Sequence, residues 1–179
     1  LDNSGNTVVE VTYTAPTGAQ KKSAITVPAT VTLVDGTVAK VTEIAANAFK
    51  NNKKVTKVTI GKNVEKIGDG AFSGCTKLKT VSVGSKVTSI GNNAFAKCTS
   101  LTKITIPETV ASIGKTAFNG DKKLKTITIK SKKLTSKNVS KNAFKGISTK
   151  TTIKVPKSKK KAYTTLFRKK GLSKKVKIK

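Results

Sequence analysis

The sequence contains no histidine, no tryptophan and no methionine, and only 8 of its 179 residues are Asp or Glu. Histidine is the usual general base near neutral pH and the commonest metal ligand. Its absence leaves catalysis to scattered carboxylates, lysines or two cysteines, and two cysteines are too few for a structural zinc site. The composition therefore predicts a protein that is not an enzyme and that has no catalytic residues, no metal site and no cofactor.

Long apolar runs are missing as well. No stretch approaches the roughly 20 apolar residues that a membrane-spanning helix needs, so no transmembrane segment is expected. The chain starts at Leu1 without the charged and then apolar residues of a secretion signal. We therefore interpret it as a mature piece from which a signal segment has been removed. Its length, and the absence of a Pro-, Gly- or Ser-rich linker, predict a single domain.

What the sequence does contain is an internal repeat. The dipeptide Ala-Phe recurs with phenylalanine spacings of 23, 23, 23 and 26 residues, at Phe49, Phe72, Phe95, Phe118 and Phe144. Each copy also holds a short segment of alternating apolar and polar residues, which is typical of a strand. One copy is too small to bury its own apolar residues, whereas stacked copies share a continuous core. The repeat predicts a solenoid with a parallel sheet on one side and short helical or 3-10 turns on the other.

Residues 90–110 give the repeat in its fullest form: Ile-Gly-Asn-Asn-Ala-Phe-Ala-Lys-Cys-Thr-Ser-Leu-Thr-Lys-Ile-Thr-Ile-Pro-Glu-Thr-Val. This pattern resembles the BspA-like, Treponema-type leucine-rich repeat family of bacterial surface proteins, over about residues 25–156. The chain departs from the family pattern at Gly61, Gly84 and Lys130, where proline is frequent. The resemblance implies a right-handed α/β leucine-rich repeat solenoid, an extracellular location on the bacterial surface, and a role in adhesion.

Both ends of the chain are expected to cap the solenoid, since its core and edge strands must be covered. Asp35-Gly36 predicts a two-residue hairpin turn, and Ser158 is a candidate N-cap of a terminal helix. The expected single domain, 1–179, has an N-terminal cap with a partial repeat and hairpin (1–43), five repeats (44–156), and a basic cap of helix and strand (157–179).

Cys75 and Cys98 occupy the same repeat position in neighbouring copies. Adjacent strands lie about 4.8 Å apart, so a stacked disulfide is geometrically possible. The alternative, which we favour, is two free thiols buried as small apolar groups. Glu43 and Glu65 are the carboxylates best placed to approach each other, and we interpret them as ordinary surface groups.

Positive charge is unevenly distributed. Residues 1–114 carry 14 basic and 7 acidic side chains, whereas residues 115–179 carry 23 basic and 1 acidic. Such a field attracts polyanions, although lysine is also a common solubilising residue. Arg168 is the only arginine, so sequence-specific recognition of nucleic acid, which relies on guanidinium groups, is not expected. The candidate polyanion patch comprises Lys157, Lys159, Lys160, Lys161, Arg168, Lys169, Lys170, Lys174 and Lys175.

The polar residues of the strands should form ladders on the concave surface, where solenoids often bind partners. These candidate residues are Lys57, Thr59, Thr80, Ser82, Lys103, Thr105, Thr126 and Thr128. Our hypothesis is a monomeric, non-enzymatic interaction or adhesion module. Its partner is a host or environmental protein or glycan, or an anionic cell-wall polymer held by the lysine-rich end. The alternative is a structural spacer or wall-tethering module with no ligand of its own.

Overall fold

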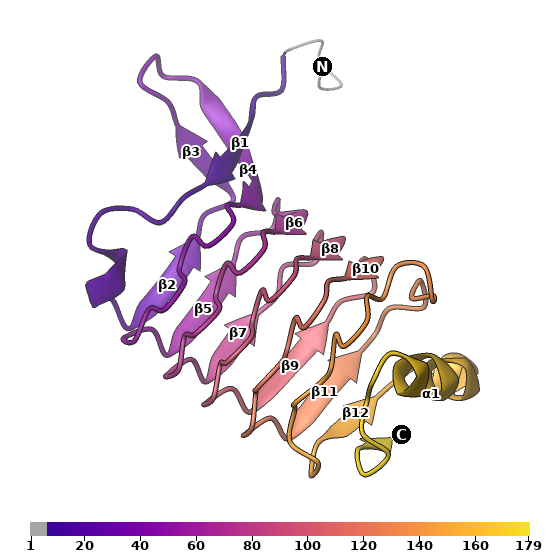
Figure 1. The fold of residues 1–179 in the computed structure, drawn as a ribbon. Coiled ribbons are helices and arrows are strands. Elements are labelled where there is room, and N and C mark those ends of the chain that lie inside the picture. The colour runs from indigo at the N-terminus through magenta and orange to yellow at the C-terminus, as the bar shows by residue number, and fades with distance from the viewer. Residues whose placement is uncertain (1–6) are drawn as a thin grey trace.

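The computed structural model describes residues 7–179 and shows a solenoid whose coils advance along one axis (Figure 1). Its main sheet has seven strands in the order β13-β12-β11-β9-β7-β5-β2. All neighbouring strands in this sheet pair in parallel. The strands are β2 (Ala24–Val27), β5 (Lys57–Ile60), β7 (Thr80–Ser82), β9 (Lys103–Ile106), β11 (Thr126–Ile129), β12 (Thr152–Lys154) and β13 (Lys177–Ile178).

A second sheet, which we call the side sheet, runs beside the first, and no pattern in the sequence indicates it. Its main path is β1 (Glu10–Tyr13), β4 (Val38–Ile44), β6 (Lys66–Ile67), β8 (Ser89–Ile90) and β10 (Ser112–Ile113). Three of these strands are two residues long, too short for an alternating pattern to be visible in the sequence. The coils that contain β5, β7 and β9 therefore each contribute a second strand, β6, β8 and β10, to this sheet, whereas the coils of β12 and β13 contribute none among the described residues.

The Ala-Phe segments are turns rather than helical or 3-10 segments. Asn47 and Asn51 have φ values of 59° and 60°, and the Ala-Phe dipeptide lies between them. A left-handed residue every fourth position prevents a helix from forming. The N–H groups of the turns instead bond the next coil, for example from Phe49 N to Ala71 O at 2.7 Å and from Phe72 N to Ala94 O at 2.8 Å.

A column of phenylalanine rings fills the core. The five repeat phenylalanines stack with centroid separations of 5.3, 5.4, 5.8 and 5.7 Å and interplanar angles of 6° or less. Tyr13 continues the column at the N-terminal end, and Phe167 closes it edge-on at the C-terminal end. All five repeat phenylalanines are fully or almost fully buried. They therefore cannot serve as an exposed surface on which nucleic-acid bases stack.

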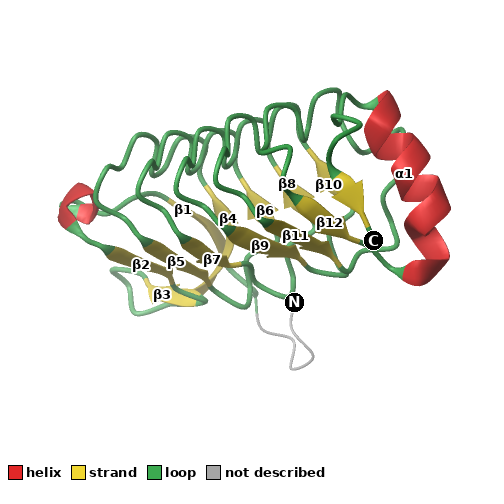
Figure 2. Ribbon diagram, turned by 90° about the horizontal axis from the view of Figure 1, so that it is seen from below, coloured by secondary structure: helices red, strands yellow, loops and turns green. Residues whose placement is uncertain are grey.

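The N-terminal part contains the expected hairpin. Strand β3 (Thr30–Thr32) pairs antiparallel with β4. The prediction of a two-residue turn is wrong. Leu33 N still bonds Thr37 O at 2.8 Å, so Val34, Asp35 and Gly36 form a three-residue loop. Gly36, at a φ of 85°, takes the left-handed position that closes such a loop. The short helix η1 (Ala19–Lys21) lies at the same end of the solenoid (Figure 2).

At the C-terminal end, η2 (Lys157–Lys159) leads into helix α1 (Lys160–Lys169), which covers the last coil (Figure 2). Ser158 is not the N-cap as predicted, because Pro156 begins a 3-10 turn that contains it, with Lys159 N bonding Pro156 O at 2.8 Å. Gly171, at a φ of 95°, follows the C-cap Lys170 and ends the helix. The expected final strand is β13, paired with β12.

Candidate interaction surface

The outer face of the main sheet carries the predicted ladders. Lys57, Thr80, Lys103 and Thr126 lie in one row, joined by the pairs Lys57↔Thr80, Thr80↔Lys103 and Lys103↔Thr126. The second row begins Thr59↔Ser82 and continues Thr105↔Thr128. Every residue of both rows is exposed or half-buried. The structure thus brings all eight candidate residues onto one surface.

The strands of this face carry lysines and no acidic residues. Beyond the two rows just described, the strands point Lys154 and Lys177 outward as well. No Asp or Glu occurs in any of the seven strands of the main sheet. Any group of negative charge that approaches these strands therefore meets lysine ammonium groups and hydroxyl groups, and no carboxylate.

The predicted polyanion patch lies on and around α1. Lys160, Lys161 and Lys169 are exposed on the helix, and Lys174 and Lys175 are exposed in the turn that follows. Two members of the patch are engaged within the protein. The Arg168 guanidinium donates to the carbonyls of Ser173 and Val176, and Lys170 Nζ donates to Ser136 O at 2.7 Å. Arg168 therefore fastens the C-terminal loop to the helix.

Among residues 7–179, Glu43 and Glu65 are not register partners, although Glu43 and Asp69 line one surface hollow. Glu43 lies opposite Lys66 in the side sheet, and Glu65 is displaced to the neighbouring position, where its N–H bonds Thr42 O at 2.7 Å. Among residues 7–179, no three His, Cys, Asp or Glu side chains gather closely enough to hold a metal ion. No helix in this part of the chain is long and apolar enough to cross a membrane.

A buried polar column runs through the coils beside the phenylalanine stack. It contains Asn52, Cys75, Cys98 and Asp121, all fully buried. Both cysteines are free thiols. Cys75 Sγ donates to Phe49 O at 3.2 Å, and Cys98 Sγ donates to Phe72 O at 3.3 Å. Burial raises the pKa of Cys75 to about 12 and that of Asp121 to about 9.

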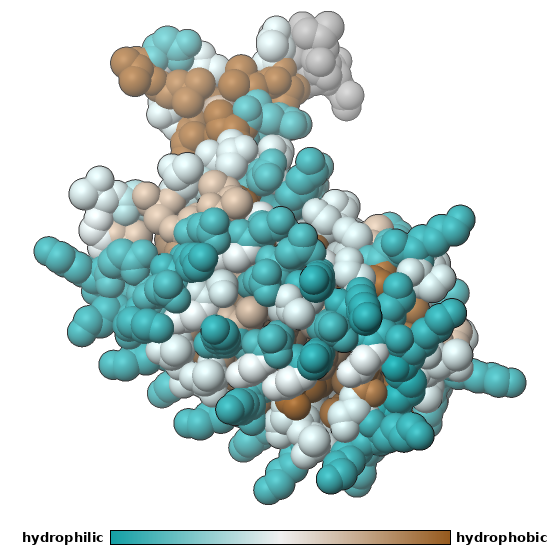
Figure 3. All heavy atoms as spheres, in the orientation of Figure 1, coloured by the Kyte–Doolittle hydropathy of each residue, from teal (hydrophilic) through white to brown (hydrophobic). Residues whose placement is uncertain are grey.

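Two surface features are not predicted from the sequence. The first is an apolar tip on the β3–β4 hairpin, visible as a brown projection in Figure 3, where Val34 and Val38 are exposed. The second is a hollow in the main sheet between β7 and β9, next to Val81, Val83 and Pro107. The sequence signals for the hollow are that both inward residues at β7 are valine, a combination that no other copy has, and that Pro107 follows the strand of the next copy.

Comparisons with known proteins agree with this architecture. Residues 42–173 match the family model of the BspA type leucine rich repeat region, in six copies. No curated protein matches the chain.

Several solved structures are similar. The Treponema pallidum leucine rich repeat protein has a TM-score of 0.71 at 26% identity, with 82% of this chain and 64% of that chain covered. A leucine-rich repeat protein from Bacteroides capillosus has a TM-score of 0.60 at 31% identity, with coverages of 66% and 86%. A leucine rich cell surface protein from Faecalibacterium prausnitzii has a TM-score of 0.51 at 30% identity, with coverages of 82% and 43%. This chain spans less than two thirds of the first and less than half of the third.

Proposed function

The chain belongs to the BspA-type leucine-rich repeat family, whose members are typically interaction and surface proteins with a non-enzymatic fold. On this premise we propose that it is an extracellular interaction module that binds a macromolecule through the outer face of its main sheet. The observation that carries the proposal is the two-row array of threonine, serine and lysine on a sheet that presents no carboxylate.

The array suits recognition because its scaffold is rigid. Both rows stand on strands held in register, β5 with β7 and β9 with β11, so within each pair the donors lie at the strand spacing of about 4.8 Å. Side chains held in place lose little conformational freedom when a partner binds, and this favours affinity. The core runs without interruption from Ala19 to Val176, which supports treating the chain as one domain.

The basic C-terminal end is the second element of the proposal, as a contact for an anionic polymer. Residues 115–179 hold 23 basic and 1 acidic side chains. Since Arg168 and Lys170 bond backbone carbonyls, the contact depends on the exposed lysines of α1 and of the turn after it. Lysines attract phosphate and sulfate without reading sequence.

A bacterial cell-surface location is supported by the Faecalibacterium prausnitzii relative, whose description is a leucine rich cell surface protein. A positively charged module at a bacterial surface would meet anionic wall polymers first. Retention at the wall and capture of a second macromolecule by the sheet are compatible, because α1 closes one end of the solenoid and leaves the sheet's outer face open (Figure 2).

The test measures binding to wall teichoic acid, heparin and duplex DNA across salt concentrations. The test variant replaces Lys160, Lys161, Lys169, Lys174 and Lys175 with Gln. The matched control replaces five exposed lysines elsewhere: Lys50, Lys54, Lys62, Lys77 and Lys122. One polymer that keeps its affinity at physiological salt, and loses it in the test variant alone, supports the proposal.

Equal affinities for all three polymers, each lost with salt, would indicate non-specific counterion release. The C-terminal lysines would then serve as a tether, as expected of a spacer module, and recognition would rest on the main sheet alone.

A further inference from the structure

The ladder between β7 and β9 has the fewest paired residues in the main sheet. These two strands share a single pair, Thr80↔Lys103, whereas β9 and β11 share four. The two coils are already farther apart just before these strands begin, as the length of a backbone hydrogen bond shows. Thr102 N lies 3.4 Å from Lys79 O, while the equivalent bond in the next coil, from Lys125 N to Thr102 O, is 2.8 Å. The main sheet is therefore locally split between β7 and β9, along a line that we call the seam.

The sequence explains one bond that is missing at this split. In the next coil, Lys130 N donates to Ile106 O at 2.9 Å. The equivalent donor one coil earlier is residue 107, and Pro107 has no N–H to offer the carbonyl of Val83. A bond is therefore missing just after β9, in addition to the long bond just before it.

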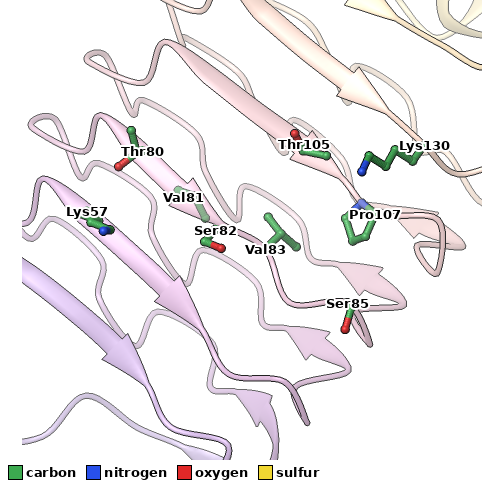
Figure 4. Close-up of a pocket in the computed structure, with 9 residues that line it drawn as sticks. All are labelled: Lys57, Thr80, Val81, Ser82, Val83, Ser85, Thr105, Pro107 and Lys130. Atoms are coloured by element: carbon green, nitrogen blue, oxygen red, sulfur yellow. The ribbon is translucent and has the colours of Figure 1, made fainter.

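A hollow of about 430 Å³ opens at this seam (Figure 4). Its floor is apolar: Val81 and Val83 are half-buried, although their repeat equivalents Ile104 and Ile106 are buried. Pro107 completes the floor, and the hydroxyl-bearing Ser82 and Thr105 stand beside it.

Lysines border the hollow and no carboxylate lines it. Lys57 and Lys130 are both exposed and belong to its lining, which contains no Asp or Glu. An apolar floor between two ammonium groups is complementary to an apolar side chain flanked by negative charges. Entry of such a side chain would remove water from the two valines, and burial of apolar surface contributes about 25 cal/mol per Å².

We propose that this hollow receives an aliphatic or aromatic side chain of an extended acidic peptide segment in a partner protein, whose flanking carboxylates pair with Lys57 and Lys130. The inference rests on the proposed function and specifies its partner at the main sheet. A polysaccharide offers mainly hydroxyl groups, and the small C–H faces of its rings would fill the floor of Val81, Val83 and Pro107 less completely than an aliphatic or aromatic side chain. An acidic peptide complements both parts of the hollow, with an apolar side chain on its floor and carboxylates at the bordering lysines.

A positional-scanning library of octapeptides tests the proposal with the intact protein. The first variant, K57E/K130E, reverses the charges of the two lysines that border the hollow. Its control, K50E/K145E, makes the same change of net charge on the turn side of the solenoid. The second variant, S82W/T105W, fills the hollow from two exposed positions, and its control T12W places tryptophan on an exposed position of the side sheet. Circular dichroism checks that each variant is folded.

The expected result is at least tenfold enrichment of peptides with Asp or Glu on either side of Leu, Ile or Phe. K57E/K130E should lose the acidic preference, S82W/T105W should lose the apolar preference, and both controls should keep them. Acidic enrichment without an apolar preference, equal in all variants, would overturn the proposal in favour of general charge attraction.

Competition separates this inference from the proposed function. If heparin oligosaccharides bind in a manner that K57E/K130E abolishes and no peptide is selected, the sheet binds a glycan and the peptide proposal is wrong. If neither class binds at the sheet, the proposed use of the main sheet fails together with this inference. Salt-resistant binding of a polymer at the C-terminal lysines would remain an independent result.

Discussion

The carboxyl group of Asp121 accepts a hydrogen bond from the backbone N–H of Cys98, one coil earlier, at 2.8 Å. Its second oxygen, Oδ2, is buried and has no hydrogen-bond partner among residues 7–179. In the two preceding coils the same column is occupied by thiols that donate to the carbonyls of Phe49 and Phe72. This relationship indicates that Asp121 is held as a neutral acid.

We therefore predict that stability falls as pH rises. Burial raises the pKa of Asp121 to about 9, whereas in the unfolded chain it ionises near pH 4. Between these values the folded protein binds one more proton than the unfolded chain, so stability is greatest at low pH and is lost toward pH 9. The slope is at most about 1.4 kcal/mol per pH unit. Urea unfolding of the wild type and Asp121→Asn at pH 5, 7 and 9 measures it. An Asn variant with the wild-type slope would show that other groups cause it.

Thiol chemistry gives a second prediction. Burial raises the pKa of Cys75 to about 12, and burial, followed by the charge that Asp121 carries once it ionises, raises the pKa of Cys98 well above its ordinary value. Because the thiolate is the reactive form, neither cysteine should react with Ellman's reagent at pH 8 until the protein is unfolded. The intact mass should be the same with and without reductant. A mass increase on reduction would reveal a disulfide and contradict the structure.

The phenylalanine column should dominate stability. Phe95 lies between Phe72 and Phe118 and is fully buried. Phe95→Ala should cost about 3–5 kcal/mol of unfolding free energy, from lost burial and the cavity left behind. Val34→Ala, at a fully exposed position, should change stability by less than about 0.5 kcal/mol. Chemical denaturation compares the two, and similar small effects would mean that the stack is not a stability determinant.

The glycine that follows each repeat isoleucine should not tolerate a side chain. A Cβ on Gly114 would lie 2.5 Å from the backbone of Gly91 and Asn92, which cannot move without shifting a whole coil. Gly114→Ala should therefore lower the melting temperature strongly. At Gly36 a Cβ meets nothing within 4 Å, and only its φ of 85° opposes the change. If Gly36→Ala destabilised as much as Gly114→Ala, close approach of the coils would not explain the motif.

These positions show what sequence reasoning could and could not recover. The solenoid, the parallel main sheet and the buried phenylalanines followed from in-phase recurrence, because every coil repeats the same contacts. The side sheet was invisible, since two-residue strands such as Lys66–Ile67 have no periodicity. The turns were misjudged as helical or 3-10 because Asn47 and Asn51 adopt left-handed angles that residue type alone only permits. The seam at Pro107 is a departure from the repeat, and the repeat itself cannot predict it.

The three 23-residue intervals between Phe49 and Phe118 have a consequence for how such a chain can change its length. In this segment the phenylalanine rings and the short strands of the side sheet contact their neighbours through equivalent positions. Duplicating or deleting one block of 23 residues would therefore restore the same contacts at the new junction and alter the length by about 4.8 Å. The 26-residue interval before Phe144 breaks this phase, so growth by whole coils is confined to the segment on its N-terminal side.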